Sequence, residues 1–245
     1  MHLKSFALTL SAIIGLAGLG TAAAGPITVT TGAGYIKMVD ALTADYQKST
    51  GRVVQKSFGG NIGQMLAQVK HGDGVNVVIS DEATLKRFND LLAPETGILG
   101  DTPLVLIWRK GLTLKTPADL SGDAVKSVAS PNPKAAIYGR SADAWLKASG
   151  LDKTVGPKLQ VVGTVPQVFS YVATGNMDAG FVNVSAAKSG RDKLGGVMEI
   201  TDDSAIVRMI VRPVKGAEND PDVKAFMDYL TSKEAKPLLQ KFGVR

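Results

Sequence analysis

The feature that most constrains this chain of 245 residues is an alternation of strand-like and helix-like segments along most of its length. Runs of β-branched and apolar residues alternate with segments whose apolar residues recur every three or four positions, as in residues 62–69. Such alternation is typical of α/β folds, in which helices cover the faces of a central sheet. The sequence therefore predicts an α/β architecture.

The expected elements follow from these periodicities and from Gly, Pro and capping residues. Strands are predicted at 27–31, 53–58, 75–80, 104–110, 125–129, 159–163, 179–184 and 205–213. Helices are predicted at 35–50, 62–71, 82–92, 135–149, 166–174, from 185 onward, and at 220–242 with an interruption at Pro237. A further helix start is expected at Thr116-Pro117.

No repeat of fixed period and no low-complexity linker divides the chain. The simplest partition is two lobes, one formed by 26–101 with 210–245 and the other by 102–209. The chain would then cross between the lobes near 101–103 and near 207–211. Two such crossings predict a hinge and a ligand-binding cleft between the lobes.

Residues 1–24 have the composition of a secretory signal. Lys4 precedes an apolar run over 6–19, and small residues follow at 22–24. The alternative is a membrane anchor, but the run is shorter than the ~20 apolar residues that a spanning helix requires. We expect cleavage after Ala24 and a soluble mature protein in the periplasm.

The remaining composition excludes several classes of protein. The chain has no Cys, which excludes disulfide scaffolds, thiol catalysis and Cys-ligated metals. Its net charge of +6 falls to +5 when Lys4 is removed, and no basic cluster contains aromatic residues, so we expect no nucleic-acid partner. His71 is the only histidine of the mature chain and is expected at a helix end in solvent. We therefore predict no metal site, no cofactor and no enzymatic activity.

Two stretches of the mature chain, 27–51 and 52–72, share one layout: a β-rich run, a small-residue loop and a helix. The first amide N–H groups of a helix lack partners within the helix, and the helix dipole is positive at that end. Such loops suit anionic or polar ligands. The glycines at 32, 34, 59 and 60 either allow this close approach or adopt φ > 0 in tight turns.

Several segments in order resemble one known family. They include SFGG after the second strand, VNVVIS before a helix, AAIYGRSADAWLKASGL after a Pro-containing loop, MDAGFVNVSAA, and the closing DVKAFMDYLTSKEAKPLLQKFGV. This arrangement is similar to the periplasmic molybdate-binding proteins, the type II solute-binding proteins of ABC transporters. The resemblance implies two lobes, each a central β-sheet flanked by helices, two hinge crossings, a monomer and an inner-membrane ABC permease as partner.

The resemblance also implies a site, although this chain departs from the family there. The family's first-loop Ser corresponds to Gly34, its Ser-Ser pair to Gly60-Asn61, and its late Tyr to Asn183, whereas Ala135 and Val165 match positions with backbone donors. Three hydroxyl donors are thus replaced, and Asn side chains also present acceptors. The candidate ligand-binding residues are Ala33, Gly34, Tyr35, Gly60, Asn61, Ala135, Val165 and Asn183.

We therefore predict an extracytoplasmic solute-binding protein for an ABC importer, with a molybdate- or tungstate-like oxyanion as the family default. The alternative is a periplasmic binding or sensor protein for a different, larger polar ligand, because Gly34 frees volume and the family's donors are replaced.

Some of the residues near these loops have structural interpretations as well. Asn61 and Thr164 stand where helix N-caps are wanted. Asn183 interrupts an apolar run, which indicates either a ligand contact or a hydrogen bond between the lobes. Tyr35 either flanks a ligand or covers a lobe surface, and Arg140 is expected in a surface salt bridge.

Overall fold

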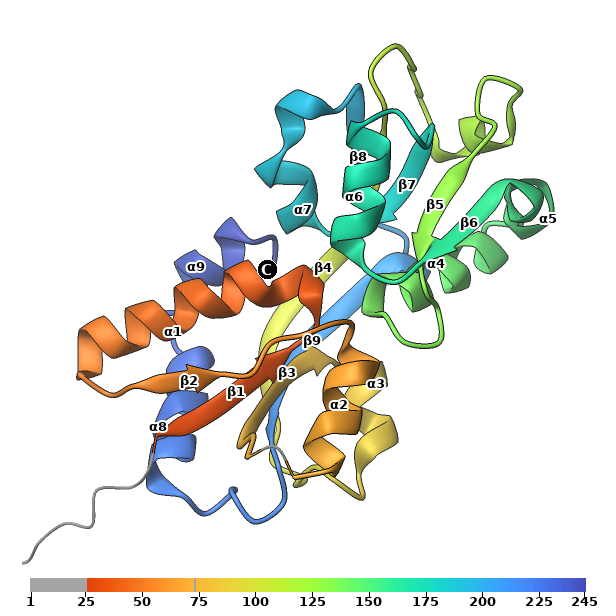
Figure 1. Cartoon of the computed structure of the whole chain (residues 1–245). Coiled ribbons are helices and arrows are strands. Elements are labelled where there is room, and N and C mark those ends of the chain that lie inside the picture. Colours follow the sequence, from red (N-terminus) through yellow and green to blue (C-terminus); the bar gives the residue numbers. More distant parts are fainter. Residues whose placement is uncertain (1–25, 73) are drawn as a thin grey trace, which may run out of the picture.

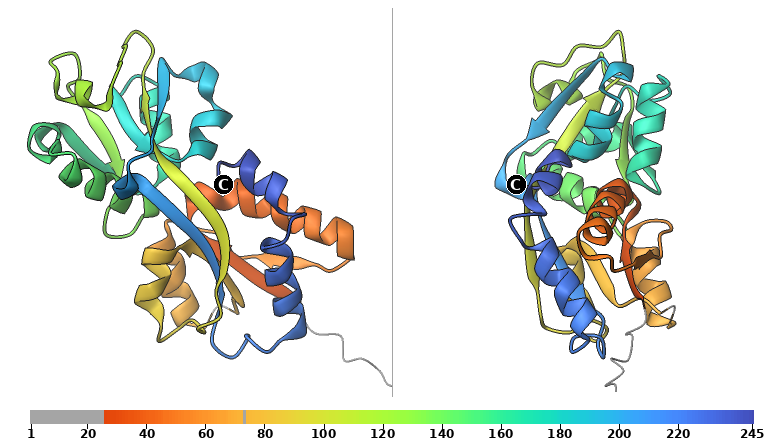
Figure 2. Two further views of the ribbon diagram at one scale, coloured as in Figure 1. Left: turned by 180° about the vertical axis from the view of Figure 1, so that it is seen from behind. Right: turned by 90° about the vertical axis from the view of Figure 1, so that its left-hand side faces the viewer.

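Two long antiparallel strands, β4 (Gly97–Trp108) and β9 (Ile206–Pro213), connect the two halves of the molecule. The computed structural model describes residues 26–72 and 74–245, so the predicted signal lies outside the described residues. The strand order is β2-β1-β3-β9-β4-β7-β5-β6, with β8 also paired to β4. Figure 2 shows β4 and β9 side by side along the back of the molecule.

Lobe I is the half that contains the N-terminal sheet (Figure 1). Its parallel strands are β1 (Ile27–Thr31), β2 (Val54–Lys56) and β3 (Val77–Asp81). Its helices are α1 (Ile36–Thr50), α2 (Ile62–Lys70), α3 (Glu82–Leu85), α8 (Pro221–Leu230) and α9 (Lys236–Lys241). The antiparallel strand β9 pairs with β3 and closes this sheet against β4.

Lobe II is the half built on the second part of β4. Its further strands are β5 (Val128–Pro131), β6 (Leu159–Val162), β7 (Ala179–Val182) and β8 (Gly196–Ile200). Its helices are α4 (Ile137–Ala148), α5 (Asp152–Val155), α6 (Val165–Ala173) and α7 (Val184–Ser189). The exact division into segments 26–101 with 210–245 and 102–209 stays a prediction about which parts move together.

The parallel strands of both lobes direct their carboxyl ends toward the space between the lobes (Figure 1). In open α/β sheets, ligands bind beyond the carboxyl ends of the strands. The turn after β1 and the turn after β7 meet there, because the Asn183 side chain donates to the Gly34 carbonyl. The α/β prediction is thus confirmed, and the fold places the predicted loops together.

Several predicted elements differ from the structure, among them the strand predicted at 104–110, which is β4 and begins at Gly97. The last helix, predicted as one helix interrupted at Pro237, is two helices that are separated over residues 231–235. Pro237 lies in the first turn of α9, where its missing N–H costs no helical hydrogen bond. The helix predicted at 82–92 is α3 followed by a 3₁₀ turn, Lys86–Phe88, and β8 was not predicted.

Among the described residues, no helix is long and apolar enough to cross a membrane, and no cluster of three or more His, Asp or Glu side chains could hold a metal ion.

One buried charge supports the lobe I end of β9. Arg212 is only 5% exposed, and its guanidinium donates to the carbonyl oxygens of Leu85, Leu92 and Ala93 and to the side chain of Asn89. Buried carbonyls that lose their donors are costly, since nothing replaces the water they gave up.

We expect Arg212→Met to lower the free energy of unfolding by about 3 kcal/mol, because it leaves several buried carbonyls without a donor. The control is Arg208→Met on the same strand, which removes a half-exposed ion pair with Asp101 and should lower the free energy of unfolding far less. Urea denaturation measures both, and equal losses in the two variants would contradict the assignment.

Candidate functional site

The first loop of the candidate site is the 3₁₀ turn Ala33–Tyr35 between β1 and α1. The Ala33 N–H donates to the Gly60 carbonyl at 3.0 Å, which joins the two predicted loops of lobe I. Gly34 does not adopt a positive φ. A Cβ on Gly34 would lie 3.3 Å from Asn183 Nδ2 and 3.6 Å from Val165 Cβ. Glycine therefore allows the close approach of lobe II, and a Cβ here would be tight against the Asn183 side chain.

The second loop ends in a capping box at the start of α2. The Asn61 side chain accepts from the Gln64 N–H at 3.1 Å, and the Gln64 side chain accepts from the Asn61 N–H at 2.9 Å. The N-cap prediction for Asn61 is confirmed. Within the first turn of α2, the Gly63 N–H donates to the Ala135 carbonyl of lobe II at 3.1 Å.

Lobe II contributes the starts of α4 and α6 and the turn after β7. Thr164 caps α6, as predicted, with its hydroxyl accepting from the Gln167 N–H. Asn183 caps α7 through its side-chain oxygen and donates its NH₂ to the Gly34 carbonyl at 2.7 Å. Of its two predicted roles, the structure thus shows a hydrogen bond between the lobes.

These loops border a small cavity of about 20 Å³ between the lobes. That volume holds little more than one water molecule. Its lining residues carry no formal charge; they are Gly32, Ala33, Gly34, Tyr35, Asn61, Ile62, Ala136, Ile137, Tyr138, Thr164 and Val165.

The cavity lining includes backbone donors that remain available. Ile62 and Val165 are the first residues of α2 and α6, where helical N–H groups have no partner within the helix. Among the described residues, the amides of Ile62, Val165 and Gly34 find no acceptor. Two helix N-termini from opposite lobes thus border one cavity, an arrangement that favours an anion.

Of the predicted ligand residues, five line the cavity: Ala33, Gly34, Tyr35, Asn61 and Val165. The other three lie directly behind the lining and hydrogen-bond to lobe I backbone: Gly60 to Ala33, Ala135 to Gly63, and Asn183 to Gly34. The Ala135 N–H already donates to the Asn132 carbonyl. Their contact with a ligand stays a prediction.

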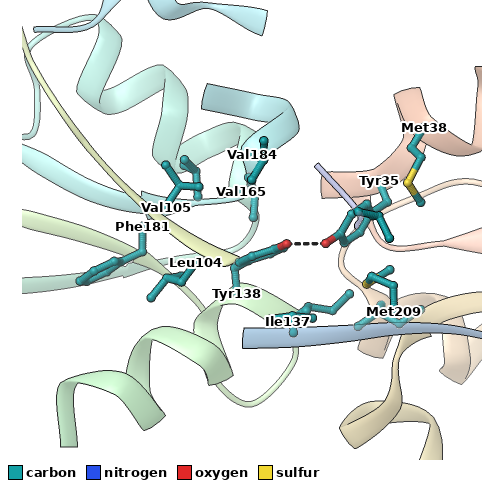
Figure 3. Packing of buried hydrophobic residues seen from close by; sticks show 14 of the residues in the cluster. Tyr35, Met38, Leu104, Val105, Ile137, Tyr138, Val165, Phe181, Val184 and Met209 are labelled. Carbon is teal, nitrogen blue, oxygen red and sulfur yellow. Dashed lines mark hydrogen bonds between the residues drawn. The ribbon is translucent and has the colours of Figure 1, made fainter. Parts of the chain in front are cut away.

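A pair of tyrosines crosses the interface beside the cavity (Figure 3). The hydroxyls of Tyr35 and Tyr138 hydrogen-bond to each other, and the Tyr138 hydroxyl also lies 3.3 Å from Thr102 Oγ1. Both side chains are at most 1% exposed. Tyr35 thus does not cover a lobe surface, and the polar role of Tyr138 was not predicted because a tyrosine in a helix usually packs in the core.

Arg140 forms an ion pair between the lobes, which corrects the expected surface salt bridge. Its guanidinium lies 2.9 Å from Asp81, and the two side chains are 22% and 8% exposed. Asp81 ends β3 and also caps α3 by accepting from the Thr84 N–H at 2.9 Å. The sequence did not reveal this pairing because the two residues are 59 positions apart.

Burial raises the pKa of both tyrosines, to about 12 for Tyr138 and well above the ordinary value of 10.0 for Tyr35. From pH 10 to pH 12 the unfolded chain therefore loses these protons while the folded chain keeps them. The contribution of these tyrosines to the free energy of unfolding is therefore complete below pH 10. Above pH 10 the free energy of unfolding falls by up to about 1.4 kcal/mol per pH unit for each tyrosine.

The Tyr35→Phe/Tyr138→Phe double variant should therefore lose less stability than the wild type between about pH 9 and about pH 11. Urea denaturation of both proteins at both pH values measures the loss of unfolding free energy in each. The other titrating groups are the same in the two proteins, so their contributions cancel in the comparison. The same pH slope in both proteins would show that these hydroxyls do not stay protonated.

Asn183→Asp separates the two roles of Asn183, because the carboxylate keeps the cap of α7 but cannot donate to the Gly34 carbonyl. We expect a melting temperature close to that of the wild type and a larger radius of gyration in solution X-ray scattering. Asn183→Ala should lower stability by about 1 kcal/mol as well, since the cap is lost. Unchanged scattering in both variants would mean that this bond does not hold the lobes together.

The chain matches the family of bacterial extracellular solute-binding proteins over residues 27–245. It is 26% identical to the molybdate-binding protein ModA of Rhodobacter capsulatus, over 98% of this chain and 96% of that protein. The periplasmic molybdate-binding protein of Azotobacter vinelandii has the same fold, with a TM-score of 0.78 and 24% identity, covering 89% of this chain and 98% of that one.

The fold is also shared with iron-bound HitA from Pseudomonas aeruginosa, with a TM-score of 0.67 and 16% identity over 88% of this chain and 84% of that one. Similarity at this level shows the fold alone. The molybdate relatives are binding proteins and not enzymes, in agreement with the sequence prediction. The chain belongs to the bacterial extracellular solute-binding protein family and has the two-lobe, type II periplasmic binding protein fold.

Proposed function

We propose that this protein captures a small oxyanion between its lobes in the periplasm and delivers it to the permease of an ABC importer. The observation that carries this proposal is the cavity whose free amide donors come from both lobes at the starts of α2 and α6. Neutral dipoles held in place by folding bind an anion without a counter-ion.

The hydroxyl donors that the resemblance implies are absent at three positions, but the cavity has other hydroxyls. Tyr35 and Tyr138 carry two hydroxyl protons, and one of them suffices for the bond between the two side chains. The second proton can point to Thr102 or to a ligand. The Asn61 NH₂ group is a further donor, because only its side-chain oxygen is used in the cap.

The size of the cavity indicates how a ligand enters. A volume of about 20 Å³ suits one water and is too small for a tetrahedral oxyanion. The lobes therefore lie closer together here than in the ligand-bound closed form, and binding requires them to separate around β4 and β9. A ligand that contacts both lobes only in the closed form shifts the equilibrium toward closure.

The test is a thermal-shift and calorimetric screen of the mature protein against molybdate, tungstate, sulfate and phosphate. An oxyanion at 100 times its Kd should stabilise the fold by about 2.7 kcal/mol. No shift with millimolar molybdate would remove that ion, and no shift with any of the four would contradict the oxyanion proposal.

Val165→Pro tests the backbone donor directly. Proline is well tolerated at the first position of a helix but has no N–H. We expect this variant to bind the oxyanion at least about tenfold more weakly, because a hydrogen bond to a charged group is lost. Val165→Ala keeps the N–H and is the matched control. Equal affinities in the two variants would exclude a ligand contact from this amide.

A further inference from the structure

A second cavity lies between the lobes and adjoins the first one at Gly34 and Val165. It has a volume of about 260 Å³, and α1 of lobe I faces α6 and α7 of lobe II across it. Its lining residues are Ala33, Gly34, Lys37, Val165, Pro166, Phe169, Ser185, Ala186, Ser189, Gly190 and Lys193. Ala33, Gly34 and Val165 line both cavities, so this outer cavity adjoins the inner, uncharged one.

The outer cavity has a cation on each side. Lys37 belongs to α1 of lobe I, and Lys193 ends the 3₁₀ turn Arg191–Lys193 of lobe II. Among the described residues, neither ammonium has a carboxylate within 4.0 Å; Asp192, the neighbour of Lys193, forms no ion pair with it. Asp40, one turn after Lys37, is paired with Lys56 instead. Two unpaired cations on opposite lobes favour closure only when an anion lies between them.

The rest of the lining suits a carbon skeleton. Val165, Pro166 and Phe169 form an apolar wall on α6. The Ser185 side chain, at 7% exposure, makes no hydrogen bond within the described residues and is a free donor. The Ser189 hydroxyl donates to the Ala186 carbonyl and keeps its acceptor sites. An inorganic ion would leave the apolar wall unused.

We propose that the outer cavity binds a small organic dianion, a short carbon chain with an acidic group at each end, held by Lys37 and Lys193 and packed against Phe169. This site adjoins the one proposed for the oxyanion and shares Ala33, Gly34 and Val165 with it, but only the outer cavity contains lysines. Its occupant contacts both lobes and therefore promotes closure from outside the inner cavity.

The experiment measures binding of succinate, glutarate and phosphonoacetate to the full mature protein by calorimetry, with butyrate and sulfate as controls. We expect a dianion to bind, and Lys37→Gln and Lys193→Gln each to weaken it by about three- to tenfold. Lys48→Gln, on the last turn of α1 and outside the cavity, should leave the affinity unchanged. Binding should also weaken as salt is added.

The outcomes separate this proposal from the oxyanion proposal. If no dianion binds, or if neither lysine variant weakens it, the outer site is wrong whatever molybdate does. If Val165→Pro abolishes dianion binding while the lysine variants do not, the dianion occupies the inner cavity and the outer site is again wrong. Dianion binding that depends on both lysines supports the outer site, even in a protein that binds no inorganic oxyanion.

Discussion

The two lobes are held together by polar contacts between their loops, and the hydrogen bond from the Asn183 side chain to the Gly34 carbonyl is one that also involves a helix cap. The same amide group caps α7 with its oxygen, so one residue holds its own helix in place and joins the two lobes. Glycine at 34 favours this contact, because a Cβ there would lie 3.3 Å from the Asn183 nitrogen and would displace it slightly. Position 34 itself carries no side-chain donor, so in the inner cavity the donors come from backbone amides and from Tyr35, Tyr138 and Asn61.

The two cavities between the lobes differ in how they can neutralise charge. The inner cavity has no charged lining residue and offers amide N–H groups at helix starts, whose positions are set by the capping of α2 and α6. The outer cavity has two ammonium groups, two serine hydroxyls and an apolar wall on α6. Fixed dipoles select by size and geometry, whereas lysines accept anions of varied shape. Because both cavities are lined by residues of both lobes, the same closing movement brings the two sides of each cavity together.

Much of the fold could be predicted from sequence because its signals are local. Hydrophobic periodicity gave most strands and helices, and the caps at Asn61 and Thr164 were recognised because a cap depends on residues only three positions apart. The element β8 was missed because its burial comes from pairing with β4, almost 100 residues earlier. The break before α9 was misplaced because proline was read as an interruption when it stands in a first helical turn.

The sequence by itself determined which loops carry small residues and free helix starts, since these follow from chain-local geometry. Only the tertiary structure decided which of those loops face each other. Tyr138 meets Tyr35 from 103 residues away, and Arg140 meets Asp81 across the same interface. β4 and β9 connect the lobes and set their relative position, which determines which side chains meet across the interface. Hydrogen bonds and ion pairs act over a few ångströms, so their identity depends on that placement and not on spacing along the chain.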